Sequence, residues 1–262
     1  MTAHPRLAHR IVAAAFAAFV ALPLVWLAYL GFLPPRAVME ARLLPTGVSL
    51  ANFAELRGSG LGRALALSLT VSGISVAGQL ALGLAAAYAI RLGLRVRWLV
   101  LVTLVLPVEL LLIPMYGLLQ QLSLLDTALA LILPFLARPV VIFLLVQALQ
   151  RFPMELLEAA ALDGARHPTL LTRIVAPVMA PHLIAAGVLG FAAHWNMVLF
   201  PRVMVADREL WTIQLWLTEL LRGRPLDWGL LGAAALLATL PLVVLFVILE
   251  RPILRAFERS FA

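Results

Sequence analysis

Six long stretches with almost no charged side chains constrain this chain more than any other feature. Each holds more than 20 residues, and a helix needs about 20 residues to cross the ~30 Å hydrocarbon layer of a membrane. Barrel strands do not fit, because they are about 10 residues long and alternate strictly. The sequence therefore predicts an all-α polytopic membrane protein in which residues 1–262 form one domain. The predicted transmembrane helices comprise residues 11–32, 64–90, 98–119, 127–150, 178–201 and 229–249.

The composition supports a membrane protein. Of the 262 residues, 63% are hydrophobic and 13% are charged, whereas soluble domains are roughly half apolar and a quarter charged. The first apolar stretch is longer than the core of a signal peptide and lacks a clear small-x-small cleavage site, so we expect it to remain as an anchor. The chain has no Cys, which excludes disulfides, thiolate metal sites and a cysteine nucleophile.

The arginines predict the orientation in the membrane. All 20 basic residues are Arg, and they stand singly or in pairs at the edges of apolar runs, a topology pattern rather than a nucleic-acid-binding stripe. Arg91, Arg95 and Arg97 lie between spans two and three, whereas residues 120–126 contain no basic residue. By the positive-inside rule the first connection is cytoplasmic and the second external, so both termini are expected in the cytoplasm.

Residues 151–177 form a long cytoplasmic connection with helical character. Pro153 suits the first position of a helix, and Glu155 and Glu158 lie in its opening turns, where the helix dipole favours acidic groups. Gly164 is placed to end that helix, and Pro168 can open a second one. The sequence predicts two short helices across the membrane face, a shape suited to contact with a partner.

The same segment resembles the EAA motif of ABC importer permeases. Glu158-Ala159-Ala160 is followed after three residues by Gly164, after nine more by Ile174, and then by Pro177. Ala176 stands where the family usually has Leu. Asp163-Gly164-Ala165 resembles the carbohydrate, maltose-type branch. Three flanking strings also resemble that branch: Pro153-Met154-Glu155-Leu156, Trp195-Asn196 and Ile113-Pro114-Met115-Tyr116.

This resemblance implies a coupling helix that docks on a separate ATPase subunit. It also implies the partners: a second homologous permease, two ATPase subunits, an extracytoplasmic substrate-binding protein and the lipid of a bacterial inner membrane. The chain has no G-x-x-x-x-G-K-[ST] phosphate loop, so we expect no enzyme activity and no bound cofactor or metal, with ATP and Mg on the ATPase partners. The residues expected to couple to the ATPase are Glu158, Ala159, Ala160, Asp163, Gly164, Ile174 and Pro177.

Glu109 and Arg138 are the only formally charged residues deep in the predicted spans. A charge at that depth costs about 3 kcal/mol on insertion scales, so each needs a partner. In an antiparallel hairpin both would lie ~15 Å below the connection between spans three and four, which predicts a Glu109–Arg138 ion pair. The pair could hold the hairpin together, or it could line the translocation path, where Arg138 would attract an anionic solute such as a sugar phosphate.

Aromatic faces with nearby donors and acceptors are typical of sugar sites. Tyr116, His194, Trp195 and Asn196 are therefore candidates for the substrate path. The alternative is that Trp195 packs between helices and Asn196 bonds across them. His182 and His194 are too far apart along one helix for a shared metal ion. Span two carries Ser68, Thr70, Ser72, Ser75 and Gln79, so we expect it to face the bundle interior.

Two other functional classes remain as rivals. A secondary transporter predicts inverted repeats and broken, ion-coordinating helices, and no repeat is visible in the sequence. An intramembrane enzyme needs a catalytic constellation at one depth, and none is visible. For an ABC permease, the main expectation is a sugar or sugar derivative, with glycerol phosphate or a polyamine as alternatives.

Overall fold

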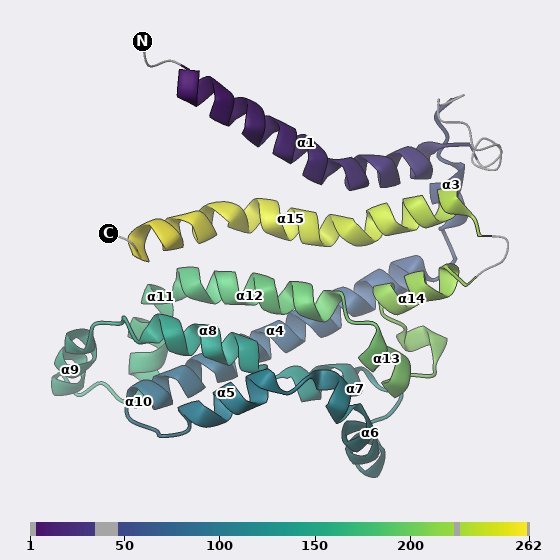
Figure 1. Ribbon diagram of the computed structural model, residues 1–262. Helices are drawn as coiled ribbons and strands as arrows, with labels where there is room; N and C mark the ends of the chain where they lie inside the picture. Colours follow the sequence, from purple (N-terminus) through teal and green to yellow (C-terminus); the bar gives the residue numbers. More distant parts are fainter. Residues whose placement is uncertain (1–3, 35–46, 223–225, 261–262) are drawn as a thin grey trace. The chain divides into compact units, whose positions relative to one another are not determined.

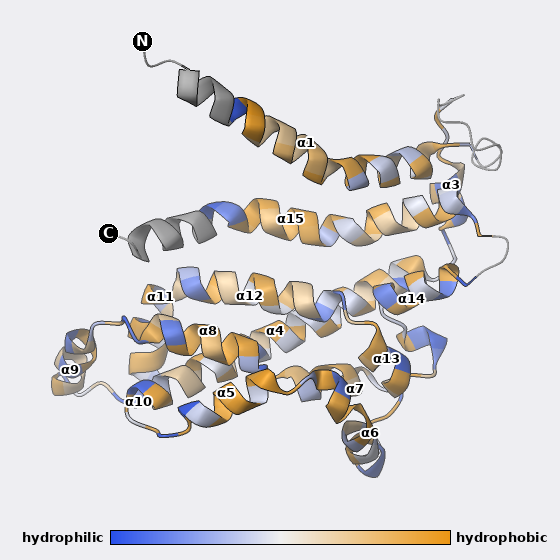
Figure 2. Ribbon diagram, viewed as in Figure 1, coloured by the Kyte–Doolittle hydropathy of each residue, from blue (hydrophilic) through white to orange (hydrophobic). Residues whose placement is uncertain are grey.

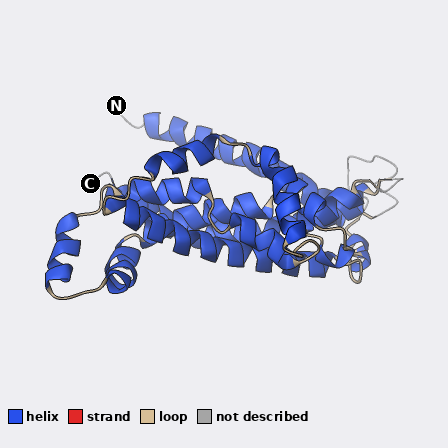
Figure 3. Ribbon diagram, turned by 90° about the horizontal axis from the view of Figure 1, so that it is seen from below, coloured by secondary structure: helices blue, strands red, loops and turns tan. Residues whose placement is uncertain are grey.

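The structure is a computed structural model and describes residues 4–34, 47–222 and 226–260. Within these ranges every regular element is a helix (Figure 3), as the sequence predicts. Three 3₁₀ turns and a π-helical segment join the α-helices; they are η1 (Val108–Leu111), η2 (Leu133–Phe135), η4 (Arg208–Leu210) and the π-helical η3 (Leu170–Val175). The α-helices are α1 (His4–Phe32), α3 (Ala51–Glu55), α4 (Leu61–Arg91), α5 (Arg97–Val105), α6 (Leu112–Gln121), α7 (Ala128–Ile132), α8 (Pro139–Leu149), α9 (Met154–Leu162), α10 (His167–Thr169), α11 (Ala176–Val178), α12 (Ala180–Trp195), α13 (Leu199–Met204), α14 (Ile213–Leu220) and α15 (Trp228–Ser260).

Four segments of the described chain are long and apolar enough to cross a membrane without a sharp bend. They are Arg10–Phe32, Leu61–Arg91, Ala128–Leu149 and Trp228–Arg251. Two bent pairs bring the number to six if each pair counts as one span; they are Arg97–Val105 with Val108–Gln121, and His167–Val178 with Ala180–Trp195. Figure 2 shows hydrophobic residues over most of each long helix and hydrophilic ones mainly at ends and connections.

Proline accompanies both bends. The chain turns by 92° between α5 and the η1–α6 segment, where Leu106 has extended backbone directly before Pro107. Proline lacks an N–H group and pushes the preceding residue out of the helical region, so the helix ends there. α12 turns by 81° from the helix before it and carries Pro181 in its first turn. Predicted span three is therefore two helices rather than one, and the second bend lies at the start of predicted span five.

The chain divides into two compact units, one formed by residues 1–63 and 216–241 and the other by residues 64–215 and 242–262. In the first unit α1 and α15 approach closely, since a Cβ added at Gly232 would lie 2.7 Å from the Leu30 Cβ atom. The buried Asn52 amide donates to the carbonyl oxygens of Gly31 and Leu33, each at 2.9 Å. These bonds satisfy carbonyl groups that the end of α1 leaves free.

In the second unit, α8 packs against both α5 and α12 (Figure 1). Four polar side chains of α4 recur every three or four residues and so share one helix face; they are Ser68, Ser72, Ser75 and Gln79, each at most 2% exposed. The burial of these four agrees with the prediction that span two faces the bundle interior, whereas Thr70, the fifth polar residue of that prediction, is exposed. A Cβ added at Gly190 of α12 would lie 2.6 Å from the Gln79 Oε1 atom, so glycine permits the close approach of the two helices.

Candidate functional site

The motif-bearing segment is built around a helix that ends at a glycine. Gly164 follows α9 with a φ of +83°. Its N–H donates to the Ala161 carbonyl oxygen at 3.0 Å, and the Ala165 N–H donates to the Ala160 carbonyl oxygen at 3.0 Å. This pair of bonds is the Schellman motif, in which a left-handed residue closes the helix. A residue with a Cβ is strained at this φ, so the glycine of the motif has a backbone function.

Buried side chains fasten this segment to α4 and α8. Its buried members in the shared apolar cluster are Phe152, Leu157, Leu170 and Val175. Two polar contacts reinforce the attachment: the Tyr88 hydroxyl lies 3.0 Å from His167 Nδ1, and Arg91 Nη2 donates to the Phe152 carbonyl oxygen at 3.4 Å. A force applied to α9 therefore reaches α4 and α8 through packed side chains.

The other face of α9 is open. Leu162 is 89% exposed and Leu156 is 46% exposed, and apolar side chains so exposed indicate a contact surface. The exposed residues of the motif are Glu158, Ala159, Asp163, Gly164 and Pro177, whereas Ala160 and Ile174 are half-buried against the apolar cluster. The sequence analysis missed Leu162, although its position four residues after Glu158 places it on the same helix face.

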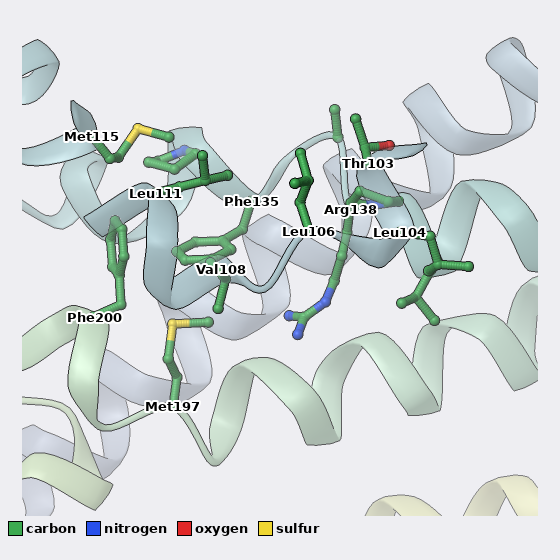
Figure 4. A pocket seen from close by; sticks show the side chains of 14 residues that line it. Thr103, Leu104, Leu106, Val108, Leu111, Met115, Phe135, Arg138, Met197 and Phe200 are labelled. Atoms are coloured by element: carbon green, nitrogen blue, oxygen red, sulfur yellow. The ribbon is translucent and has the colours of Figure 1, made fainter. Parts of the chain in front are cut away.

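The second candidate region is a cavity of about 300 Å³ (Figure 4). Three interruptions of the helices meet around it. Leu106 and Val108 line it at the break after α5, residues 137–139 line it at the break before α8, and Met197 and Phe200 line it beyond the end of α12. Non-helical backbone at membrane depth is tolerated where it is buried in protein or lines a cavity.

The structure does not form the predicted Glu109–Arg138 ion pair. Glu109 lies in η1, just beyond the 92° bend, and its side chain is exposed. Arg138 lines the cavity, and its side chain has no hydrogen bond or ion pair with any described residue; Nη1 is buried without a partner. The prediction assumed two straight antiparallel helices, and the breaks at Pro107 and before Pro139 remove that geometry.

Two other predicted pathway residues lie near the cavity without lining it. His194 is 6% exposed, and its ring meets Phe135 edge-on with 5.2 Å between centroids. Phe135 itself lines the cavity and meets the Phe200 ring at 4.7 Å. Tyr116, in α6, is 38% exposed and is not a lining residue.

Trp195 and Asn196 make contacts that suit helix packing. Trp195 is 1% exposed and stacks on Phe191 at 5.5 Å. Asn196 donates to the Ala192 carbonyl oxygen at 2.8 Å, and its Oδ1 atom accepts from Gln214 Nε2 at 3.2 Å. Of the six residues predicted for the pathway, Arg138 alone lines the cavity.

The sequence analysis missed most of the cavity wall. Phe135, Met197 and Phe200 have no distinctive spacing in the sequence. Phe135 belongs to an interrupted span, and Met197 and Phe200 follow the end of α12. The signal that could have located them is proline inside an apolar stretch: Pro107, Pro134 and Pro139 all fall within predicted spans three and four.

Comparison with protein families decides the identity. Residues 79–259 match the family described as binding-protein-dependent transport system inner membrane component, a range that includes both the motif-bearing segment and the cavity. The chain belongs to this family. As a binding-protein-dependent permease it is a membrane protein and a transporter subunit, which confirms the resemblance noted in the sequence.

Similar proteins agree with this family. The arabinooligosaccharides transport system permease protein AraQ of Halalkalibacterium halodurans is 29% identical over 249 residues, which cover 90% of this permease and 89% of AraQ. The sn-glycerol-3-phosphate transport system permease protein UgpE of Yersinia pestis is 33% identical over 190 residues, covering 70% and 68%. The fold resembles a crystal structure of a bacterial ABC transporter involved in import of the acidic polysaccharide alginate, with a TM-score of 0.80, 18% identity and coverage of 94% and 95%.

Proposed function

We propose that this permease is one of two membrane subunits of an ATP-driven importer for a sugar or sugar derivative in the bacterial inner membrane. The observation that carries the proposal is the exposed face of α9, the helix that bears the motif residues. The opposite face of α9 is packed against the bundle through the apolar cluster. Similarity to AraQ supports a sugar substrate. Similarity to UgpE supports a glycerol phosphate as the second candidate.

In this proposal, ATP and Mg bind to two separate ATPase subunits, and α9 docks on one of them. The 262 residues contain no Lys, so they lack the lysine of a nucleotide-binding phosphate loop. Closure of the ATPases moves α9, and the apolar cluster passes the motion to α4 and α8. α8 is 11 residues long, about 16 Å, and its first residues line the cavity. It thus joins the contact surface to the cavity directly.

A second, related permease completes the translocation path, and a substrate-binding protein delivers the solute from outside. Both termini lie in the cytoplasm in this arrangement, which the arginines between spans two and three support. ATP binding opens the cavity outward, and hydrolysis returns it to the inward-facing state.

Reconstitution in liposomes tests the proposal. The complete assembly, with its binding protein, is expected to take up radiolabelled arabinooligosaccharide or another sugar only when ATP is present inside. The permease alone is expected to transport nothing. Uptake by the permease alone, driven by an ion gradient, would contradict the proposal and favour a secondary transporter, whose broken helices the bent spans resemble.

A further inference from the structure

We propose that the cavity binds an anionic oxygen group of the transported solute, a carboxylate or a phosphate, with Arg138 as its cationic contact. The inference rests on the proposed function, because it assigns a substrate class to the same translocation path. It is carried by the position of Arg138, the chemistry of the wall around it and the helix that begins beside it.

Arg138 carries a charge at the middle of a span. It is the eleventh of the 22 residues of Ala128–Leu149. Charged side chains at such depth are rare, and they pair with an opposite charge or mark a substrate or ion path. No described carboxylate pairs with Arg138, and its Nη1 atom is buried without a hydrogen-bond partner. The guanidinium therefore lacks the counter-charge that its position requires.

The cavity wall isolates this charge. Arg138 is the one charged residue among the 14 that line the cavity, and most of the others are apolar. Figure 4 shows the Arg138 side chain extending into the side of the cavity where Val108 and Met197 lie. An apolar wall lowers the local dielectric and strengthens the attraction for an anion. A guanidinium also matches the two oxygens of a carboxylate or phosphate with parallel N–H donors.

The start of α8 adds a second positive element at the same place. Arg138 is the N-cap of this 11-residue helix, and Pro139 and Val140, its first residues, line the cavity. The first N–H groups of a helix have no partner within it, and the helix dipole makes this end partially positive. The helix start and the guanidinium thus favour the same kind of ligand. The volume of about 300 Å³ lies at the lower end of small-molecule pockets, enough for one acidic sugar unit or a phosphate ester.

Ligand binding to the purified complete assembly tests the site. The probes are glucuronate and glycerol 3-phosphate, each compared with its neutral counterpart, glucose or glycerol, by isothermal titration without the binding protein. At least one anion is expected to bind the wild type more tightly than its neutral counterpart, and the two anions distinguish a carboxylate from a phosphate ligand. R138Q is expected to weaken that binding about tenfold to a hundredfold, the worth of a hydrogen bond to a charged group. R138K, which keeps the positive charge, is expected to lose less affinity for the anion than R138Q.

Controls separate this site from the proposed function. R57Q removes an exposed arginine far along the chain from the cavity residues and is expected to bind the anion like the wild type. R138Q is expected to assemble with the second permease. Equal affinity of R138Q and the wild type, or preference for the neutral probes, would overturn the site alone. Lost assembly in R138Q would also overturn it, since Arg138 would then pair with an acidic residue of the second permease. A wild-type assembly whose ATP hydrolysis ignores the binding protein would instead overturn the proposed function.

Discussion

The motif-bearing segment and the cavity lie at opposite ends of α8 and differ in almost every physical respect. The segment is exposed, and its acidic residues Glu158 and Asp163 lie at its surface beside the open Leu162 side chain. The cavity is lined by apolar side chains with one cation, Arg138. The difference indicates two kinds of partner: a protein surface for the first and a small solute for the second. Because the two partners differ, an assay of ATPase docking and an assay of solute binding should distinguish changes at the two ends.

Phe135→Ala is expected to have the largest effect on stability. The buried Phe135 ring contacts the rings of His194 and Phe200 at the cavity wall, and deleting such a ring costs about 3–5 kcal/mol of unfolding free energy. Denaturant unfolding of the solubilised assembly measures it. Phe135→Leu is the matched control, with a loss of about 1 kcal/mol. If Phe135→Ala is as stable as the wild type, the cavity wall is loosely packed. The cavity would then not differ in packing from the exposed motif-bearing segment.

Leu157→Ala is expected to cost about 2–5 kcal/mol, because this side chain lies in the cluster that attaches α9 to α4 and α8. Its neighbour Leu156 is 46% exposed, so Leu156→Ala should change the unfolding free energy by at most about 0.5 kcal/mol. Proteolysis of the segment reports the same loss of attachment. Equal protease sensitivity of the two variants would mean that α9 is not fastened through its buried face.

Gly164→Ala is expected to have a smaller effect, a loss of about 1–2 kcal/mol, since its φ of +83° is unfavourable for a residue with a Cβ. Gly164→Asn should lose less, because asparagine tolerates the left-handed region better. Gly117→Ala serves as the control: it lies in α6 with no atom within 4 Å of an added Cβ, and alanine is favoured over glycine in a helix. A lower thermal unfolding temperature for Gly117→Ala than for Gly164→Ala would contradict the requirement for glycine in the Schellman motif that ends α9.

The segment could be predicted from the sequence because its shape depends on local residues. Gly164 ends α9 through its own backbone conformation, and Pro168 lies in the first turn of α10, as expected. Pro153 was placed one residue too far into the helix, since it precedes α9 as its N-cap. These features act over a few residues, which is the range that sequence patterns describe.

The cavity could not be predicted in the same way. The prediction of a Glu109–Arg138 pair assumed two straight antiparallel helices. The 92° turn at Pro107 instead places Glu109 on an exposed surface. Apolar length identifies a span but does not reveal where it bends. Met197 and Phe200 join the wall because α12 ends at Trp195 and the chain turns back toward spans three and four. That convergence depends on long-range packing.

Cross-linking at Leu162 tests most directly whether α9 is the contact with the ATPase. The chain has no Cys, so Leu162→Cys introduces its single thiol, and Ile113→Cys, at a position 85% exposed on α6, is the matched control. In an assembly that hydrolyses ATP, a short thiol-to-amine reagent is expected to join residue 162, but not residue 113, to an ATPase subunit. A cross-link from residue 113 alone, or none from residue 162, would contradict the assignment of α9 as the coupling surface.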